Sequence, residues 1–131
     1  PEDAERALLS GTDRRDLIAR SEAVLSADDV RALRGAVSEV HASEALIAYV
    51  QTLMARSRHH PGVRVGLSPR AGLALLRAAR AHALLLGRAH ALPEDVQTLF
   101  IAVAAHRLVA DADGGDGTAM AKSILHAVMV D

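Results

Sequence analysis

The stretch Gly66-Leu67-Ser68-Pro69-Arg70-Ala71 marks the start of a helix and decides how the middle of this 131-residue chain is organised. Ser68 is a good N-cap residue, and Pro69 suits the first helical position because its fixed φ is already helical. Arg70 therefore falls in the first turn. The partial positive charge of the backbone N–H groups there disfavours a cation by about 0.3–1 kcal/mol.

The unusual position of Arg70 has two interpretations. Free N–H groups and a guanidinium at one helix start make a site for an anion, and phosphate suits both. Alternatively, the Arg70 side chain extends into solvent or pairs with a nearby carboxylate. The motif taken by itself favours this second interpretation.

The helix that begins at Pro69 is predicted to run to Leu86, because Gly87 directly after it is a typical C-terminal stop. It consists largely of Ala and Leu, so we expect it to be the central and most buried helix. After Gly87, Pro93 begins a further helix that His106-Arg107 close. The stripe of this further helix that should be buried consists of Val96, Leu99, Phe100 and Val103.

Two helices are predicted before Pro69. Ser26 and Asp29 form a capping box for the first, and apolar residues follow it at helical spacing. This stripe, which should be buried, consists of Val30, Leu33, Val37 and Val40. The second helix starts near Ser43 and ends at Pro61-Gly62, and Val63-Arg64-Val65 then form a short extended connector.

The two ends of the chain carry weaker signals. A short helix is expected over Pro1 to Leu9, and one helical turn around Asp16 to Ala19. Thr118 can cap a last helix near the C-terminus. The predicted fold class is all-α: a four-helix bundle with short N- and C-terminal extensions.

Composition excludes several classes of protein. The net charge is −1 and both signs are interspersed, so the chain has no field to attract nucleic acid or an acidic membrane. Because the chain has no cysteine, thiol catalysis and thiolate metal sites are excluded. No apolar run approaches the roughly 20 residues that a membrane-spanning helix needs, so we expect no membrane insertion.

No metal or catalytic constellation is evident. The loop from Asp111 to Gly117 fails as a calcium site because Asp116 replaces the required glycine and Lys122 replaces the bidentate glutamate. The adjacent histidines His59-His60 point apart on a helix. The chain has neither a nucleophile elbow nor a phosphate-binding Gly-Lys loop, so it looks catalytically incomplete.

A stand-alone helical module, either a protein-interaction adaptor or a weak DNA-binding module, is the alternative. A basic cluster near the end of the second helix could touch phosphates; it consists of Arg56, Arg58, His59 and Arg64. A DNA-reading helix needs base-reading side chains on its exposed face. The helix that begins at Pro69 offers only Arg77, Arg80 and His82, and the net charge argues against strong phosphate binding.

Five segments in order resemble the C-terminal lid of MoxR-type AAA+ ATPases. They are Arg58-His59-His60-Pro61-Gly62-Val63, Val65-Gly66-Leu67-Ser68-Pro69-Arg70-Ala71, Gly87-Arg88, Pro93-Glu94-Asp95-Val96 and His106-Arg107. The resemblance implies that residues 1–21 end the AAA+ core, that 22–109 form the helical lid and that 110–131 form a loop and C-terminal helix or tail. Leu92 departs from the family, which commonly has a capping Ser or Thr there, and little resemblance extends past Asp111.

The resemblance gives Arg70 a role as the second-sensor arginine, held by Ser68 and Pro69, in ATP hydrolysis. ATP and Mg²⁺ would be bound mainly by a core that this chain lacks, so the chain alone should bind neither tightly and hydrolyse nothing. Expected partners are that core, neighbouring subunits of a ring and often a von Willebrand factor A-domain protein. The family implies chaperone-like protein remodelling in the bacterial cytoplasm, and the net charge of −1 leads us to expect no nucleic-acid partner.

Overall fold

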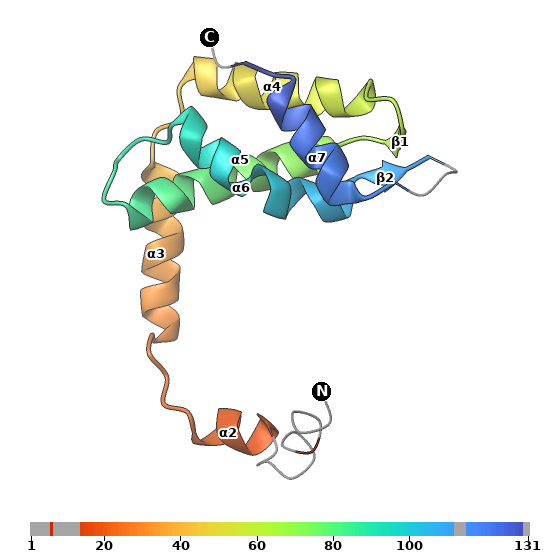
Figure 1. Ribbon diagram of the computed structural model, residues 1–131. Coiled ribbons are helices and arrows are strands. Elements are labelled where there is room, and N and C mark those ends of the chain that lie inside the picture. Colours follow the sequence, from red (N-terminus) through yellow and green to blue (C-terminus); the bar gives the residue numbers. More distant parts are fainter. Residues whose placement is uncertain (1–5, 7–13, 112–114, 130–131) are drawn as a thin grey trace. The chain divides into compact units, whose positions relative to one another are not determined.

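Helices dominate the computed structural model, which describes residues 6, 14–111 and 115–129 (Figure 1). The chain divides into two units, Pro1–Arg31 and Ala32–Asp131. The described elements are α2 (Arg14–Arg20), α3 (Ala27–Glu39), α4 (Glu44–Arg58), β1 (Val63–Val65), α5 (Pro69–Leu85), α6 (Pro93–Ala104), the 3-10 turn η1 (Ala105–Arg107), β2 (Val109–Ala110) and α7 (Gly117–His126). Apart from Arg6, the helix expected over Pro1 to Leu9 lies outside the described residues.

The capping signals near the start of the described chain act as predicted. The backbone N–H of Asp29 donates to Ser26 Oγ at 3.1 Å, and the Asp29 carboxylate accepts from the Ser26 N–H at 2.8 Å. This reciprocal pair is a complete capping box for α3. Helix α2 covers Arg14–Arg20 and is therefore longer than the single turn expected around Asp16 to Ala19.

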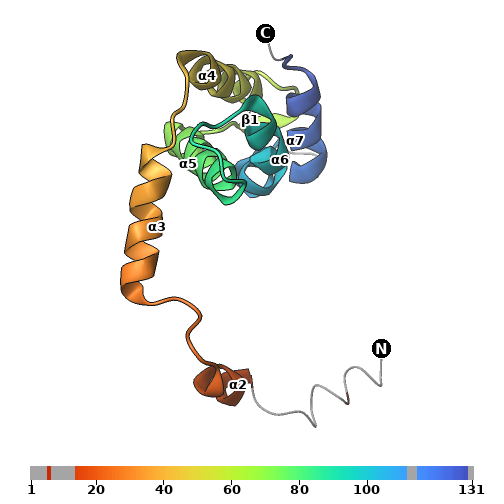
Figure 2. The same cartoon turned by 90° about the vertical axis from the view of Figure 1, so that its left-hand side faces the viewer.

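The core forms where α4, α5, α6 and α7 pack together (Figure 2). Each of these helices contributes a side chain that is at most 1% exposed: Leu53 from α4, Leu75 from α5, Phe100 from α6 and Ile124 from α7. Ala79 and Ala83 in α5 are also fully buried, which lets neighbouring helices approach closely. The core is thus aliphatic apart from Phe100 and Tyr49.

The predicted membership of the helical bundle needs correction. The apolar stripe of α3 was expected to be buried, but α3 has no buried residue. Val30 and Leu33 of this stripe are 36% and 46% exposed. Val40, just beyond the helix, is buried. Helix α7, expected as an extension, instead supplies the fourth core helix by burying Met120, Ala121 and Ile124. Periodicity identifies an apolar face but does not say which neighbour covers it.

The helix rich in Ala and Leu buries only one face. Its buried residues are Ala71, Gly72, Leu75, Ala79 and Ala83. On other faces Leu73 is 70% exposed and Leu85 is 83% exposed. The prediction that α5 is the most buried helix is therefore wrong for its outer side, where leucine faces solvent.

A small antiparallel sheet corrects the purely helical prediction. Val63–Val65, expected as a short extended connector, is extended as predicted, and it also pairs with β2 as strand β1. The Asp111 N–H also donates to the Gly62 carbonyl at 2.9 Å. Three alternating residues carry too little information to predict so distant a partner. The pairing fastens the connector between α4 and α5 to the segment between η1 and α7.

A second backbone link fastens the segment between α3 and α4 to the loop between α5 and α6. The His41 N–H donates to the Ala89 carbonyl at 2.9 Å, and the Ala91 N–H donates to the His41 carbonyl at 2.9 Å. No helix in the described part of the chain has the length and apolar character needed to span a membrane.

Candidate functional site

The start of α5 has the geometry that the sequence predicts. Ser68 has extended backbone angles, φ −78° and ψ 163°, as an N-cap residue requires. Its Oγ accepts from the Ala71 N–H at 3.3 Å, and Pro69 occupies the first turn. Because Pro69 has no N–H and that of Ala71 is bonded to Ser68, the Arg70 N–H remains without an intrahelical partner.

Arg70 extends from this start as an exposed side chain. Among the residues that the structure describes, it makes no hydrogen bond and no ion pair, and the first turn of α5 has no acidic residue. The ion pair with a nearby carboxylate that one interpretation of the sequence offered is therefore absent from the described chain, whereas the exposed Arg70 agrees with that interpretation's side chain in solvent. A free N–H and a free guanidinium at one helix start can together bind an anion.

The end of α4 holds the chain just before this helix start. The Leu67 N–H donates to Ser57 Oγ at 2.8 Å, and Arg58 Nε donates to the Leu67 carbonyl at 3.2 Å. Gly66 permits the close approach, because a Cβ there would lie 2.7 Å from the Arg58 backbone nitrogen. Both Leu67 and Ser57 are buried. The position of Ser68, and hence of Arg70, is thus set by the C-terminal turn of α4.

Sequence reasoning missed these holding residues. It placed Arg58 in a basic cluster that could touch phosphates, whereas its Nε is engaged by a backbone carbonyl. Ser57 was not predicted to have a role, although it is fully buried and also donates to the Met54 carbonyl at 2.7 Å. A signal existed: Arg58 and Gly66 both stand within the segments that carry the family resemblance.

The other end of α5 is joined to the start of α6 by a buried carboxylate. Asp95 is 1% exposed and binds Arg88 through two contacts, from Nη1 to Oδ2 at 2.9 Å and from Nη2 to Oδ1 at 2.6 Å. Its Oδ1 also lies 2.6 Å from His82 Nδ1, and its Oδ2 accepts from the Leu92 N–H at 2.7 Å. Both carboxylate oxygens of Asp95 therefore have two polar partners each.

The guanidinium of Arg88 holds the pKa of the Asp95 carboxyl well below its usual range, helped by the hydrogen bonds from Leu92 and His82. The same bond raises the pKa of Arg88. Gly87 makes this meeting possible: at φ +72° it ends α5 with the Arg88 N–H donating to the Ala83 carbonyl, and the chain then turns Arg88 toward α6. The sequence indicated Gly87 as the helix end and accounted for Asp95 by capping and the helix dipole, of which the capping bond is present, but it did not predict Arg88 and His82 as partners.

Leu92 is the N-cap of α6 and supplies no side-chain hydrogen bond, as the sequence predicts. The Asp95 carboxylate compensates by accepting from the Leu92 N–H. At the last helix the sequence prediction is wrong by two residues. Asp116, not Thr118, is the N-cap of α7, because its carboxylate accepts from the N–H groups of Thr118 and Ala119.

Within the described residues, no group of three or more His, Cys, Asp or Glu side chains is placed to hold a metal ion. His59 Nδ1 lies 2.9 Å from the Ala55 carbonyl, and His60 Nε2 lies 3.0 Å from Ser123 Oγ in α7. These two rings therefore contact different elements. Residues 112–114 of the loop from Asp111 to Gly117 lie outside the described chain.

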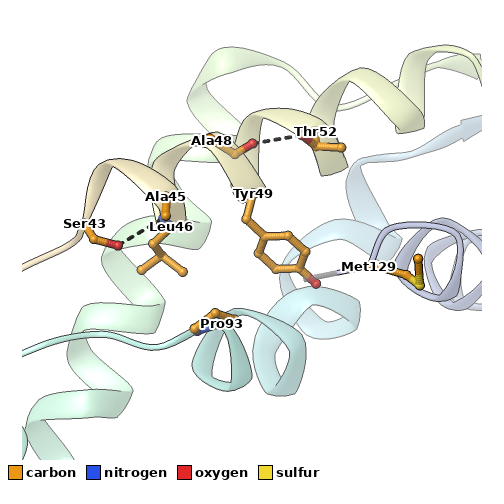
Figure 3. Close-up of a pocket in the computed structure, with 8 residues that line it drawn as sticks. All are labelled: Ser43, Ala45, Leu46, Ala48, Tyr49, Thr52, Pro93 and Met129. Atoms are coloured by element: carbon orange, nitrogen blue, oxygen red, sulfur yellow. Dashed lines mark hydrogen bonds between the residues drawn. The ribbon is translucent and has the colours of Figure 1, made fainter. Parts of the chain in front are cut away.

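A pocket of about 290 Å³ opens at the other half of α4, away from the turn that holds Leu67 (Figure 3). Tyr49 projects from α4 into the space near Pro93 of α6 and Met129. The remaining lining residues are Ser43, Ala45, Leu46, Ala48 and Thr52. Because none of the lining residues is charged, this pocket lacks the cations that a phosphate would need.

Comparison with known proteins gives this architecture a class. The model of the AAA lid domain family matches residues 55–126, which include the α5 start, the Asp95 network and α7. The chain belongs to the AAA lid domain family. The match extends beyond Asp111, where the sequence itself offered little resemblance.

Two further similarities concern longer proteins. The chain is 32% identical over 127 residues to the uncharacterized protein YeaC of Bacillus subtilis (strain 168), covering 94% of this chain and 40% of YeaC. The crystal structure of a proposed ATPase from Cytophaga hutchinsonii ATCC 33406 matches with a TM-score of 0.74 and 26% identity, over 79% of this chain and 36% of that one. This chain thus spans well under half the length of either relative.

Proposed function

We propose that this chain is the lid of a MoxR-type AAA+ ATPase and that Arg70 is its second-sensor arginine. One observation carries the proposal: an exposed arginine without a partner in the described chain stands in the first turn of a helix that is firmly held. Membership of the lid family and the similarity to a proposed ATPase support it. A helix start built in this way suits phosphate.

In this proposal ATP and Mg²⁺ are bound mainly by a core outside this chain, and the lid closes over them. The Arg70 guanidinium would donate to oxygens of the γ-phosphate and stabilise the charge that develops as the phosphoryl group transfers. Ser68 and Pro69 would keep the helix start in place. Because Leu67 is hydrogen-bonded to Ser57 and Arg58, a movement of Arg70 on binding phosphate would also displace the end of α4.

The wider organisation follows from the same proposal. Residues 1–21 would end the core, residues 22–109 would form the lid and residues 110–131 would form the C-terminal extension. The lid would contact its own core and neighbouring subunits of a ring. The whole protein would remodel other proteins in a chaperone-like manner, with a von Willebrand factor A-domain protein as a partner, in the bacterial cytoplasm where ATP is supplied.

Replacing Arg70 in the full-length protein tests the proposal. Arg70→Ala should lower the rate of ATP hydrolysis at least about tenfold, which corresponds to about 1.4 kcal/mol of lost transition-state stabilisation. The melting temperature followed by circular dichroism should not fall, since Arg70 has no partner in the described chain. Arg70→Lys should recover only part of the rate, because an ammonium cannot reproduce the planar fork of donors.

Arg64→Ala is the matched control. Arg64 is an exposed arginine on β1, close in sequence but outside the first turn of α5, and its loss should change the rate less than about twofold. If Arg70→Ala leaves both ATP turnover and the melting temperature unchanged, Arg70 is an ordinary surface residue and the sensor assignment is wrong.

A further inference from the structure

A groove of about 150 Å³ runs between α3 and α5 on the outer side of α5. Its lining residues are Val37, Ser38, Leu73, Leu76, Arg77 and Arg80. The apolar part includes Leu73, which is 70% exposed although it is a leucine in a well-formed helix. The groove therefore combines an apolar surface open to solvent with two arginines.

Within the described part of the chain, the arginines of this groove lack counter-charges. Helix α5 contains Arg70, Arg77 and Arg80 but no Asp or Glu. Neither Arg77 nor Arg80 forms an ion pair or hydrogen bond with a residue in the described ranges, and Arg80 Nε is buried without an acceptor. A buried donor without an acceptor is costly, so this nitrogen points to an acceptor supplied from outside the described residues.

The groove is separate from the proposed phosphate contact at Arg70. With a rise of about 1.5 Å per residue, Arg77 lies about 10 Å and Arg80 about 15 Å along α5 from Arg70. Arg70 is not among the residues that line the groove. A ligand of the groove is thus a second ligand, and its binding does not depend on the role of Arg70.

We propose that the groove between α3 and α5 binds an acidic segment of a partner protein. A carboxylate of that segment would accept from Arg77 and Arg80, including the buried Nε, in a charge-assisted contact. A neighbouring apolar side chain would cover Leu73 and Val37. A nucleic acid fits less well, because half of the lining is aliphatic and the chain has a net charge of −1.

The proposal is tested by fluorescence anisotropy with this chain and a fluorescein-labelled helical peptide that carries leucines on one face and flanking glutamates. The glutamate peptide should bind saturably, and a matched peptide with glutamine in place of glutamate should bind at least about tenfold more weakly. Arg77→Glu should weaken binding of the glutamate peptide by at least about tenfold, since it reverses a contacting charge. Arg64→Glu, the matched charge reversal outside the groove, should change it less than about twofold.

Three results would overturn the proposal: no saturable binding up to about 1 mM, equal binding of the glutamine peptide, or equal losses in Arg77→Glu and Arg64→Glu. Tighter binding of a single-stranded DNA oligonucleotide than of the peptide would assign the groove to nucleic acid instead. Arg77→Glu is the decisive variant because Arg77 is exposed, and circular dichroism verifies that it folds.

The full-length protein distinguishes this groove from the phosphate contact. Without peptide, Arg77→Glu should leave ATP turnover within about twofold of the unmodified protein, whereas Arg70→Ala should not. A loss in Arg77→Glu as large as that in Arg70→Ala would show that the protein's own core covers the groove, and a separate partner would then be ruled out. If the glutamate peptide does not bind, the groove proposal fails, but the measurement of ATP turnover in Arg70→Ala still tests the sensor assignment.

Discussion

The starts of α5 and α6 share a design and differ in what they do with charge. Both have proline in the first turn. At α6 the acidic residue, Asp95, suits the helix dipole and is buried among three partners. At α5 the first turn carries Arg70, which opposes the dipole and is exposed and unpaired within the described chain. The charge at the α6 start therefore stabilises the fold, whereas the charge at the α5 start is one that the helix dipole disfavours.

The largest effect is expected where the stable start is broken. Asp95→Asn removes the negative charge that pairs with Arg88, while keeping the size of the side chain. Removing one partner from a buried ion pair leaves the Arg88 guanidinium uncompensated, so the free energy of unfolding should fall by about 3 kcal/mol. Urea denaturation of this chain measures it.

Glu94→Gln is the matched control for Asp95→Asn. Glu94 is the neighbouring acid in the same first turn, but it is exposed and should cost only about 0.3–1 kcal/mol through the helix dipole. If the two variants lose equal stability, Asp95 contributes through the dipole alone, and the contrast between the two helix starts disappears.

Acid should act mainly through the same carboxylate. Since the pKa of Asp95 is lower in the folded chain than the unfolded value of about 3.9, its contribution is fully present above about pH 4. That contribution is lost as the pH falls toward the folded pKa. Between pH 5 and pH 3 the unmodified chain should lose about 1 kcal/mol more than Asp95→Asn, which lacks the group. Parallel losses in urea denaturation at the two pH values would contradict this assignment.

The α5 start could be predicted from sequence because it is local. Ser68, Pro69 and Arg70 are consecutive, and capping depends on residues within one turn. The Asp95 site could not be predicted in this way, since His82 lies on another helix and Arg88 reaches Asp95 only because Gly87 takes a positive φ. The position of Asp95 in the first helical turn could therefore be predicted from the sequence, but its contacts with His82 and Arg88 could not.

The same limit applies to the fold. Apolar spacing predicted helices at α3, α4, α5 and α6 and a final helix near α7, and all five are present. It could not tell that Val30 and Leu33 would remain exposed while the shorter α7 packs into the core. Nor could it pair Val63–Val65 with a strand more than forty residues away, since two short strands gain stability only from their surroundings.

The smallest effect is expected at α5 and has the opposite sign. Arg70→Glu should raise the free energy of unfolding by about 0.3–1 kcal/mol, because it replaces a disfavoured cation with a favoured anion in the first turn and breaks no contact in the described chain. Arg77→Glu, in the middle of the same helix, should change stability less because the dipole effect is confined to the helix ends. The gain from Arg70→Glu, measured by urea denaturation, should shrink as salt is added. A loss of stability instead would mean that Arg70 supports the fold, whereas a gain would show that the arginine is retained at a cost to stability, as expected of a residue kept for binding.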